Sequence, residues 1–379
     1  MKKRFKIFAV TLICSLFSGV MTVNTVKAEN LPVKAKYLYD FNTGTEIYAY
    51  NENERLPIAS MTKIMLLDLV YENIELKNLS LDEEITISET ASGMGGSQVF
   101  LEAGRNYTVS NLIKSVTVAS ANDASVALAE RLYGSEDNCV IKMNEKAKNL
   151  GLNNTLFSNC TGLPKPMQYS SAKDIALIFA DLIKHEGYFE YSKIWMDKIE
   201  HSKNSTEIAN TNKLIKFYNG CDGGKTGFTN EAGFCLTATA KRGNMRLISS
   251  VIGASDSKTR FNETSKLLNE GFNGYENKAV LDKNIPLDFK AKVESSKQGL
   301  VEVYPERNYF VLCKKGEKPK VDFEYQLNKV KAPVYKGDKI GKVTIYVNGV
   351  ESGSVNLLSA TNALKMNYFD TLREIANNW

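Results

Sequence analysis

Histidine is scarce in this chain. Its 379 residues include only two histidines, His185 and His201. A zinc site built from three histidines is therefore nearly excluded, and a zinc carboxypeptidase is disfavoured. A Ser-His-Asp triad is weakened for the same reason, because its general base is a histidine.

Cysteine is too sparse to hold the fold together. Five cysteines follow residue 28, and they are widely spread: Cys139, Cys160, Cys221, Cys235 and Cys313. They form neither a CxxC metal motif nor a disulfide framework. One bridge between Cys221 and Cys235 stays open as an alternative, but we expect free thiols.

The chain beyond its first residues has no excess of basic charge. Of 48 basic residues, five lie within positions 1–28, which contain no acid. The 43 that remain balance the 43 acidic residues. This balance gives no indication of a nucleic-acid partner.

Residues 1–28 are typical of a secretory signal peptide. A basic segment, Lys2 to Lys6, precedes an apolar core, Ile7 to Met21, and Val26-Lys27-Ala28 fits a cleavage site. An uncleaved membrane anchor is the alternative, but the core is short for a membrane span. We therefore expect export across the cytoplasmic membrane and an extracytoplasmic protein.

The pattern of elements predicts an α+β fold. Alternating residues predict β-hairpins at 35–50 and 233–252. Amphipathic helices are predicted between them, within 109–133, 139–150 and 172–185, and a further helix at 259–271. This order predicts one antiparallel sheet flanked by helices, with a helical insertion.

The sequence pattern changes near Lys278. Short alternating runs separated by Pro, Gly and Lys predict a small all-β domain of the sandwich type. The predicted strands are 285–293, 299–303, 309–313, 320–327 and 342–347. Apolar residues spaced three and four apart, from Leu364 to Trp379, then predict an amphipathic helix. The predicted parts are a signal peptide (1–28), an α+β domain (29–275), a β domain (276–360) and a terminal helix (361–379).

A serine and a lysine lie three residues apart at the start of an apolar run. Ser60 and Lys63 share one face if the run is a helix, and Pro57 fits its entry. A serine hydroxyl beside a neutral amine is a candidate nucleophile with its base. Taken alone, this pattern is explained better by an N-cap serine followed by a surface lysine.

Two further motifs favour the interpretation of Ser60 as a nucleophile. Ser120-Ala-Asn122-Asp precedes an apolar helix, and Asp222 to Thr229 contains Lys225-Thr-Gly just before the second hairpin. Ser-x-x-Lys, Ser-x-Asn and Lys-Thr-Gly in this order are the set found in penicillin-binding proteins and serine β-lactamases. A glycine-rich loop, 92–97, lacks the ending of a phosphate loop and is interpreted as mobile backbone near a cleft.

From these motifs the chain resembles the low-molecular-mass penicillin-binding proteins that are serine-type D-alanyl-D-alanine carboxypeptidases. The resemblance covers about residues 31 to 360. It includes these further segments: 57–63, 120–124, 143–144, 150–163, 222–229 and 332–349. It implies a penicillin-binding, β-lactamase-like domain and removal of the terminal D-alanine from peptidoglycan stem peptides. It also implies covalent inhibition by β-lactams and no cofactor.

The resemblance also implies a role for each site residue. Ser60 would form the acyl-enzyme, with Lys63 as its base, and burial together with the second cation Lys225 would lower the pKa of Lys63. Lys225 would also attract the anionic substrate. Ser120 would pass a proton to the leaving amine, and Asn122 would hold Lys63 and the substrate. The backbone N–H groups of Ser60 and Phe228, next to Gly227, would form the oxyanion hole. Thr226 and Arg260 would bind the terminal carboxylate, although a surface salt bridge is an alternative for Arg260.

Two other functions are weighed against this one. A β-lactamase shares the motifs but needs a base for rapid deacylation, and the nearest glutamate, Glu145, lies in a plain helical pattern. A non-catalytic cell-wall-binding protein would not need the complete motif set. Cys221 departs from the family, and we interpret it as a small buried side chain rather than a reactive thiol beside the cleft. The terminal helix could pack on the protein or lie on a membrane surface.

Overall fold

The computed structural model describes residues 32–377, so the predicted signal peptide and Trp379 lie outside the described part. An antiparallel five-stranded sheet has the order β2-β1-β9-β8-β7. Its strands are β1 (Ala35–Asp40), β2 (Thr45–Tyr50), β7 (Cys221–Thr229), β8 (Gly233–Arg242) and β9 (Met245–Ala254). Both predicted hairpins are therefore present, and β7, which carries the Lys-Thr-Gly motif, is an edge strand.

The segment between β2 and β7 is largely helical, as predicted. Its helices are η1 (Ala59–Thr62), α1 (Lys63–Glu75), α2 (Glu89–Ser92), α3 (Val109–Lys114), η2 (Ser115–Ala119), α4 (Asn122–Tyr133), α5 (Glu136–Asn149), α6 (Ala172–Leu182), α7 (Tyr188–Ser192) and α8 (Leu214–Phe217). Two small two-stranded sheets complete it, β3 (Glu84–Thr86) with β4 (Asn106–Thr108) and β5 (Met196–Glu200) with β6 (Ser205–Ala209).

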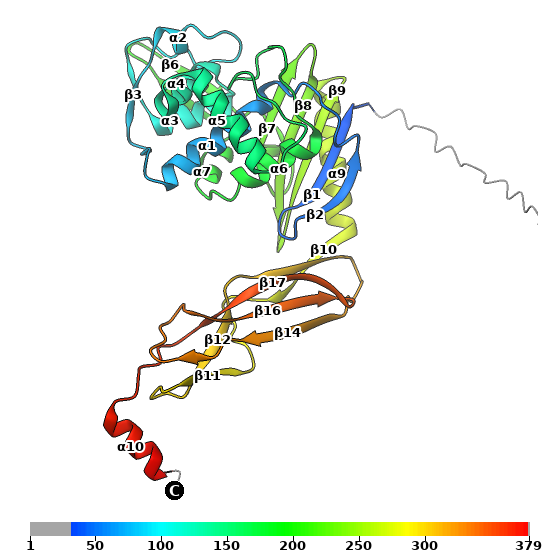
Figure 1. Ribbon diagram of the computed structural model, residues 1–379. Coiled ribbons are helices and arrows are strands. Elements are labelled where there is room, and N and C mark those ends of the chain that lie inside the picture. Colours follow the sequence, from blue (N-terminus) through cyan, green and yellow to red (C-terminus); the bar gives the residue numbers. More distant parts are fainter. Residues whose placement is uncertain (1–31, 378–379) are drawn as a thin grey trace, which may run out of the picture. The chain divides into compact units, whose positions relative to one another are not determined.

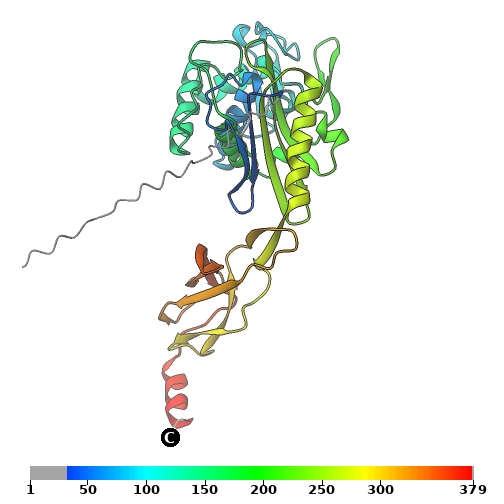
Figure 2. The ribbon, with the colours of Figure 1, turned by 90° about the vertical axis from the view of Figure 1, so that its right-hand side faces the viewer.

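Helices cover both faces of the five-stranded sheet (Figures 1 and 2). On one face α6 packs against β1 and β9, and the η1 turn packs against β7. On the other face α9 (Ser257–Gly274) packs along β8 and β9. The structure confirms the predicted α+β layout with its helical insertion.

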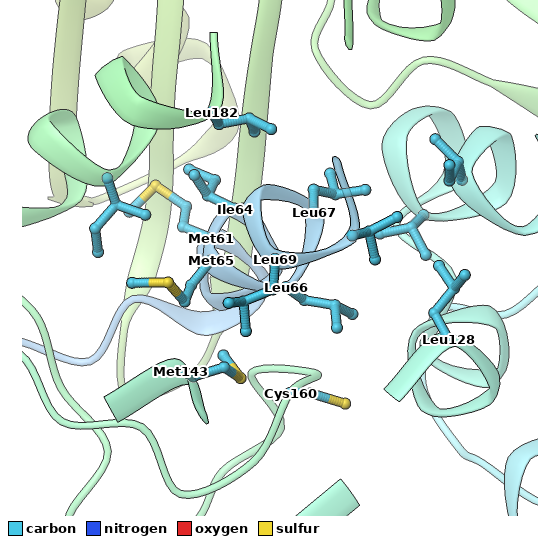
Figure 3. Close-up of a cluster of buried hydrophobic side chains, with 14 of the residues drawn as sticks. Met61, Ile64, Met65, Leu66, Leu67, Leu69, Leu128, Met143, Cys160 and Leu182 are labelled. Atoms are coloured by element: carbon cyan, nitrogen blue, oxygen red, sulfur yellow. The ribbon is translucent and has the colours of Figure 1, made fainter. Parts of the chain in front are cut away.

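Helix α1 lies inside the domain rather than on its surface. Residues 63–71 are all buried, including Lys63 and Asp68. Figure 3 shows Leu66 and its neighbours on α1 surrounded by Leu128 of α4, Met143 of α5 and Leu182 of α6. A helix that is apolar on all sides is stable only where other elements enclose it. The helix that follows Ser60 is therefore held rigidly by its neighbours.

The chain after α9 forms the predicted small β domain. A six-stranded sheet has the order β14-β16-β17-β12-β11-β15, and β10 pairs with β13. The strands are β10 (Tyr275–Leu281), β11 (Lys290–Glu294), β12 (Leu300–Pro305), β13 (Tyr309–Lys314), β14 (Val321–Leu327), β15 (Val330–Lys331), β16 (Lys339–Val347) and β17 (Val350–Ser359). Its core contains Val303, Ile340, Val343 and Leu357.

Two predicted boundaries in this domain are wrong. Residues 285–289 are not in a strand, and β11 begins only at Lys290. The terminal helix α10 (Tyr368–Asn377) begins at Tyr368 rather than near residue 361. Bridges from Ala363 to Val334 and from Lys365 to Ser296 tie the preceding segment to the β domain. Backbone pairing therefore overrides the helical spacing of Leu364.

Candidate active site

Ser60 lies in the 3₁₀ turn η1, directly before α1. Its neighbour Ala59 has a φ of +48°, which is a strained conformation for a residue with a side chain. Two glycines allow other chain segments to reach this turn. A Cβ at Gly162 would lie 2.1 Å from the Ala59 carbonyl oxygen, and one at Gly227 would lie 2.5 Å from that of Ile58. The turn that carries Ser60 is therefore in close contact with two other segments, one at Gly162 and one at Gly227.

Lys63 is fully buried, and its amine has three oxygen neighbours. Its Nζ lies 3.1 Å from Ser60 Oγ and 2.7 Å from Asn122 Oδ1, and it also donates to the Thr161 carbonyl. Asn122 Nδ2 donates to the Gly95 carbonyl at 2.6 Å, so the amide oxygen of Asn122 is turned to Lys63. The carbonyls can only accept hydrogen bonds. A neutral amine can therefore donate to both of them and keep its lone pair for the Ser60 hydroxyl.

Burial adjusts the charge state of this amine. Removal of water lowers the pKa of Lys63 to about 7. The pKa of Lys225 is also lowered, by burial and by the charges of Lys63 and Arg260. Burial, which was expected to act together with a second cation, is thus the main cause at Lys63. The repulsion between the positive charges disfavours the charged form of Lys225 as well.

Ser120 lies next to Lys225, the second lysine of the site. It lies between η2 and α4 in the left-handed conformation, with a φ of +63°. Lys225 Nζ on β7 is 2.7 Å from Ser120 Oγ. The structure therefore brings Ser60, Lys63, Ser120, Asn122 and Lys225 together from three separate parts of the chain.

The last residues of the motif strand lie next to Arg260. Thr226 is buried, while the Phe228 side chain on the edge strand β7 is 52% exposed. The guanidinium of Arg260, on α9, donates to the Gly227 carbonyl at 3.2 Å. Arg260 is 9% exposed, and among the described residues no ion pair joins it to a carboxylate. The alternative of a surface salt bridge for Arg260 is therefore wrong.

Two contributors to the site were not predicted from the sequence. The Asp123 carboxylate is buried and accepts hydrogen bonds from the N–H groups of Val99, at 3.1 Å, and Leu101, at 3.0 Å. It therefore ties the segment after the glycine-rich loop to α4. Asp123 was visible beside the Ser-x-Asn motif, but its partners are backbone atoms. The Thr161 carbonyl that faces Lys63 has no signature in a sequence.

The residues weighed for other functions lie elsewhere. Glu145 is exposed on α5 and pairs with Lys142 at 2.7 Å, so it is not placed to act as a deacylation base. The five cysteines within the described residues are free and buried, which rules out the alternative Cys221–Cys235 bridge. Burial raises the pKa of Cys221 to about 12, as expected for an inert thiol. Residues 32–377 contain no cluster of acidic, histidine or cysteine side chains able to hold a metal.

Comparisons with known proteins show the family to which the chain belongs. Residues 22–256 match the family described as D-alanyl-D-alanine carboxypeptidase, peptidase S11, and residues 275–364 match the C-terminal domain of penicillin-binding protein 5. A relative from Bacillus subtilis, D-alanyl-D-alanine carboxypeptidase DacF, is 39% identical over 91% of this chain and 90% of its own.

Solved structures give the same result. Penicillin-binding protein 5 from Haemophilus influenzae is 32% identical, with a TM-score of 0.70, and the match covers 90% of this chain and all of that one. Penicillin-binding protein D2 from Listeria monocytogenes, solved with bound ampicillin, is 33% identical, with a TM-score of 0.58, over 64% of this chain and 98% of its own. This chain therefore belongs to the D-alanyl-D-alanine carboxypeptidase family.

Proposed function

We propose that Ser60 is the nucleophile of a carboxypeptidase that removes the terminal D-alanine from peptidoglycan stem peptides. The contact between the Lys63 amine and the Ser60 hydroxyl, at 3.1 Å, carries this proposal. Lys63 accepts the hydroxyl proton while Ser60 Oγ attacks the carbonyl between the two D-alanines. The C–N bond breaks, D-alanine leaves, and an ester on Ser60 remains until water hydrolyses it.

Ser120 and Lys225 assist the leaving group. Their contact of 2.7 Å provides a hydroxyl that can pass a proton to the departing amine and recover one from the lysine. The backbone N–H groups of Ser60 and Phe228 form the oxyanion hole for the tetrahedral intermediate. Gly227 permits this arrangement, because a side chain there would collide with the turn that carries the nucleophile.

Thr226 and Arg260 bind the carboxylate of the terminal D-alanine. Arg260 is nearly buried and has no acidic partner among residues 32–377, so its charge is available to an anionic substrate. Lys225 lies near enough to Arg260 that the charge of Arg260 lowers its pKa, so the two basic groups belong to one site. A stem peptide ending in D-alanyl-D-alanine has the single anionic end that such a site favours.

Mass spectrometry of the intact protein with a β-lactam tests the nucleophile. A β-lactam presents a strained amide to Ser60, so we expect a covalent adduct of one inhibitor that persists for minutes. Ser60→Ala should form no adduct and release no D-alanine, with an unchanged circular dichroism spectrum. Ser80→Ala, at an exposed serine outside the site, is the matched control and should behave like the parent protein.

Two outcomes of this experiment contradict the proposal. An adduct on Ser60→Ala would show that another residue is the nucleophile. Hydrolysis of many equivalents of β-lactam per second, without a lasting adduct, would indicate a β-lactamase instead.

We further propose that the protein is exported and contacts the membrane surface through α10. The signal-peptide pattern supports export. Tyr368, Phe369 and Leu372 of α10 are exposed, and ten helical residues suffice to lie in the interface but not to cross a bilayer. Within the described part of the chain, no helix is both long and apolar enough to be a transmembrane span.

Vesicle sedimentation tests the membrane contact. We expect the protein to sediment with phospholipid vesicles, and the double variant Phe369→Asp, Leu372→Asp to remain in solution. Tyr335→Asp removes an exposed aromatic residue from the β domain and should sediment like the parent protein. Equal sedimentation of the parent protein and the double variant would contradict the contact.

A further inference from the structure

The guanidinium of Arg260 lies against two phenylalanine rings. Its Cζ atom is 5.5 Å from the ring centre of Phe234 on β8 and 4.8 Å from that of Phe261 on α9. Both distances are within the range of cation–π attraction. Two rings supplied by different elements therefore restrict where the planar guanidinium can lie.

The polar contacts of Arg260 leave part of its hydrogen-bonding capacity unused. Nη1 donates to the carbonyls of Gly227, at 3.2 Å, and Cys235, at 3.4 Å. Nε is buried, and no residue in the described range accepts a hydrogen bond from it. Burial of a cation without a paired anion is costly. An arrangement of this kind is expected where a ligand supplies the anion.

Phenylalanine rings suit this task better than acidic side chains would. They attract a cation through their faces but have no formal charge and no strong acceptor. They can therefore hold the guanidinium in place without neutralising it. An aspartate or glutamate at either position would form a salt bridge and compete with the substrate carboxylate.

The ring of Phe234 also connects Arg260 to the edge of the site. Phe228 stacks on it with a centroid distance of 4.3 Å, and Phe228 is the half-exposed residue directly after Gly227. Phe228 and Phe234 face each other as paired residues of β7 and β8. The ring that contacts the arginine is thus fixed by the same strand that carries Lys225 and Thr226.

We propose that Phe234 and Phe261 are positioning residues that hold the uncompensated guanidinium of Arg260 for the terminal carboxylate of the substrate. The preference of the enzyme for a free C-terminal carboxylate over a C-terminal amide then depends on these two rings. This inference rests on the proposed function, because it assigns the residues that orient its carboxylate-binding group.

Steady-state kinetics with two tripeptides test it. Both end in D-alanyl-D-alanine, one as the free acid and the other as the C-terminal amide, and release of D-alanine or D-alaninamide is measured. The parent protein should favour the acid by tenfold or more in kcat/KM, the scale expected for a charged hydrogen bond. Phe234→Leu and Phe261→Leu should each reduce this ratio about tenfold, mainly through a higher KM for the acid.

Four further variants separate positioning from general damage. Phe234→Tyr keeps the ring and should keep the preference. Phe272 lies on the same helix as Arg260, but its ring contacts a different arginine, Arg242, at 4.4 Å. Phe272→Leu should therefore leave the ratio unchanged. Arg260→Ala should abolish the preference, and adding Phe234→Leu to it should change the ratio no further, since both act through one group.

The outcomes are distinguishable. An unchanged ratio in both leucine variants, with normal circular dichroism and normal adduct formation, overturns the positioning role and leaves the proposed nucleophile intact. An equal fall of the ratio in Phe272→Leu also overturns it, because the effect would then come from loosening of the domain. If the parent protein releases no product from either peptide, the proposed function itself fails, and the inference fails with it.

Discussion

At the scale of single residues, two kinds of partner give a buried lysine and a partly buried lysine opposite properties. Lys63 faces carbonyl and hydroxyl oxygens, and burial lowers its pKa. Lys146 lies near Asp68, at 2.7 Å, and Asp181, at 3.3 Å. Burial disfavours its charge as well, but the carboxylates outweigh that effect and raise its pKa. A lysine with carboxylate neighbours therefore stays charged and has a structural role, whereas a lysine with only neutral oxygen neighbours can act as a base.

The lowered pKa of Lys63 predicts the pH dependence of acylation. The amine accepts a proton from Ser60 only when it is neutral, and its pKa is about 7. Below this pH the rate of adduct formation with a β-lactam should fall about tenfold per pH unit. Above it the rate should reach a plateau. The rate of adduct formation is measured by rapid mixing and quenching at a series of pH values, followed by mass spectrometry.

A control separates the lysine from other titrating groups. Binding of the inhibitor before the covalent step is measured with Ser60→Ala over the same pH range, and should vary little. A rate for the parent protein that stays constant from pH 5 to 9, or falls as the pH rises, would contradict a base with this pKa.

At the scale of elements, the site depends on how closely the segments approach each other. The segment that contains Thr161 reaches the η1 turn because Gly162 has no side chain and adopts a φ of +83°. Strand β7 reaches the same turn at Gly227. The buried helix α1 fixes the turn from the other side (Figure 3). Small changes in these contacts are expected to move Ser60 relative to Lys63.

We predict that Gly162→Ala lowers both stability and acylation. The new Cβ would meet the Ala59 carbonyl oxygen, so the two segments must separate, and left-handed backbone adds strain. The free energy of unfolding should fall by about 2–4 kcal/mol, and adduct formation should slow at least tenfold. Urea denaturation and timed mass spectrometry measure the two effects.

Gly134→Ala is the matched control for this prediction. Gly134 has a similar φ of +79°, but a Cβ there would have no neighbour within 4 Å. The free energy of unfolding of this variant should fall only by the cost of the strained backbone, about 1–2 kcal/mol, and its acylation rate should not change. Equal loss of stability and activity in the two variants would show that the contact with Ala59 has no special role.

At the scale of the whole molecule, the motif residues all lie before the β domain. The solved chain from Listeria monocytogenes matches 64% of this chain with 98% of its own length, so that solved chain has no counterpart of the remaining part. We propose that the α+β domain, residues 29–275, carries the catalytic residues by itself. The β domain has its own core of Val303, Val343 and Leu357, as an independent domain requires.

Removal of the β domain tests this division. A protein ending at residue 275 should form the β-lactam adduct at a rate within about twofold of the full chain, since α9 ends at Gly274 and no motif residue is lost. The same truncation with Ser60→Ala is the control and should form none. Failure of a folded, monomeric truncated protein to react would show that the β domain contributes to the site.

The sequence by itself determined the elements and the local part of the site. Hydrophobic periodicity predicted the hairpins and helices, and the i, i+3 spacing of Ser60 and Lys63 placed these two side chains together, because one helical turn has a known geometry. Contacts within a few residues follow from chain geometry alone. The order of the three motifs, together with the family resemblance, then predicted the remaining site residues.

Tertiary structure alone decided the rest. Lys63 meets the Thr161 carbonyl 98 residues away, and Lys225 meets Ser120 105 residues away. Backbone atoms carry no residue identity, so neither the Thr161 contact nor the partners of Asp123 could be predicted from the sequence. The lowered pKa of Lys63 depends on exclusion of water by enclosing elements, and the rings around Arg260 come from different segments. Such properties arise only when distant parts of the chain pack together, because desolvation and ring contact depend on position in space.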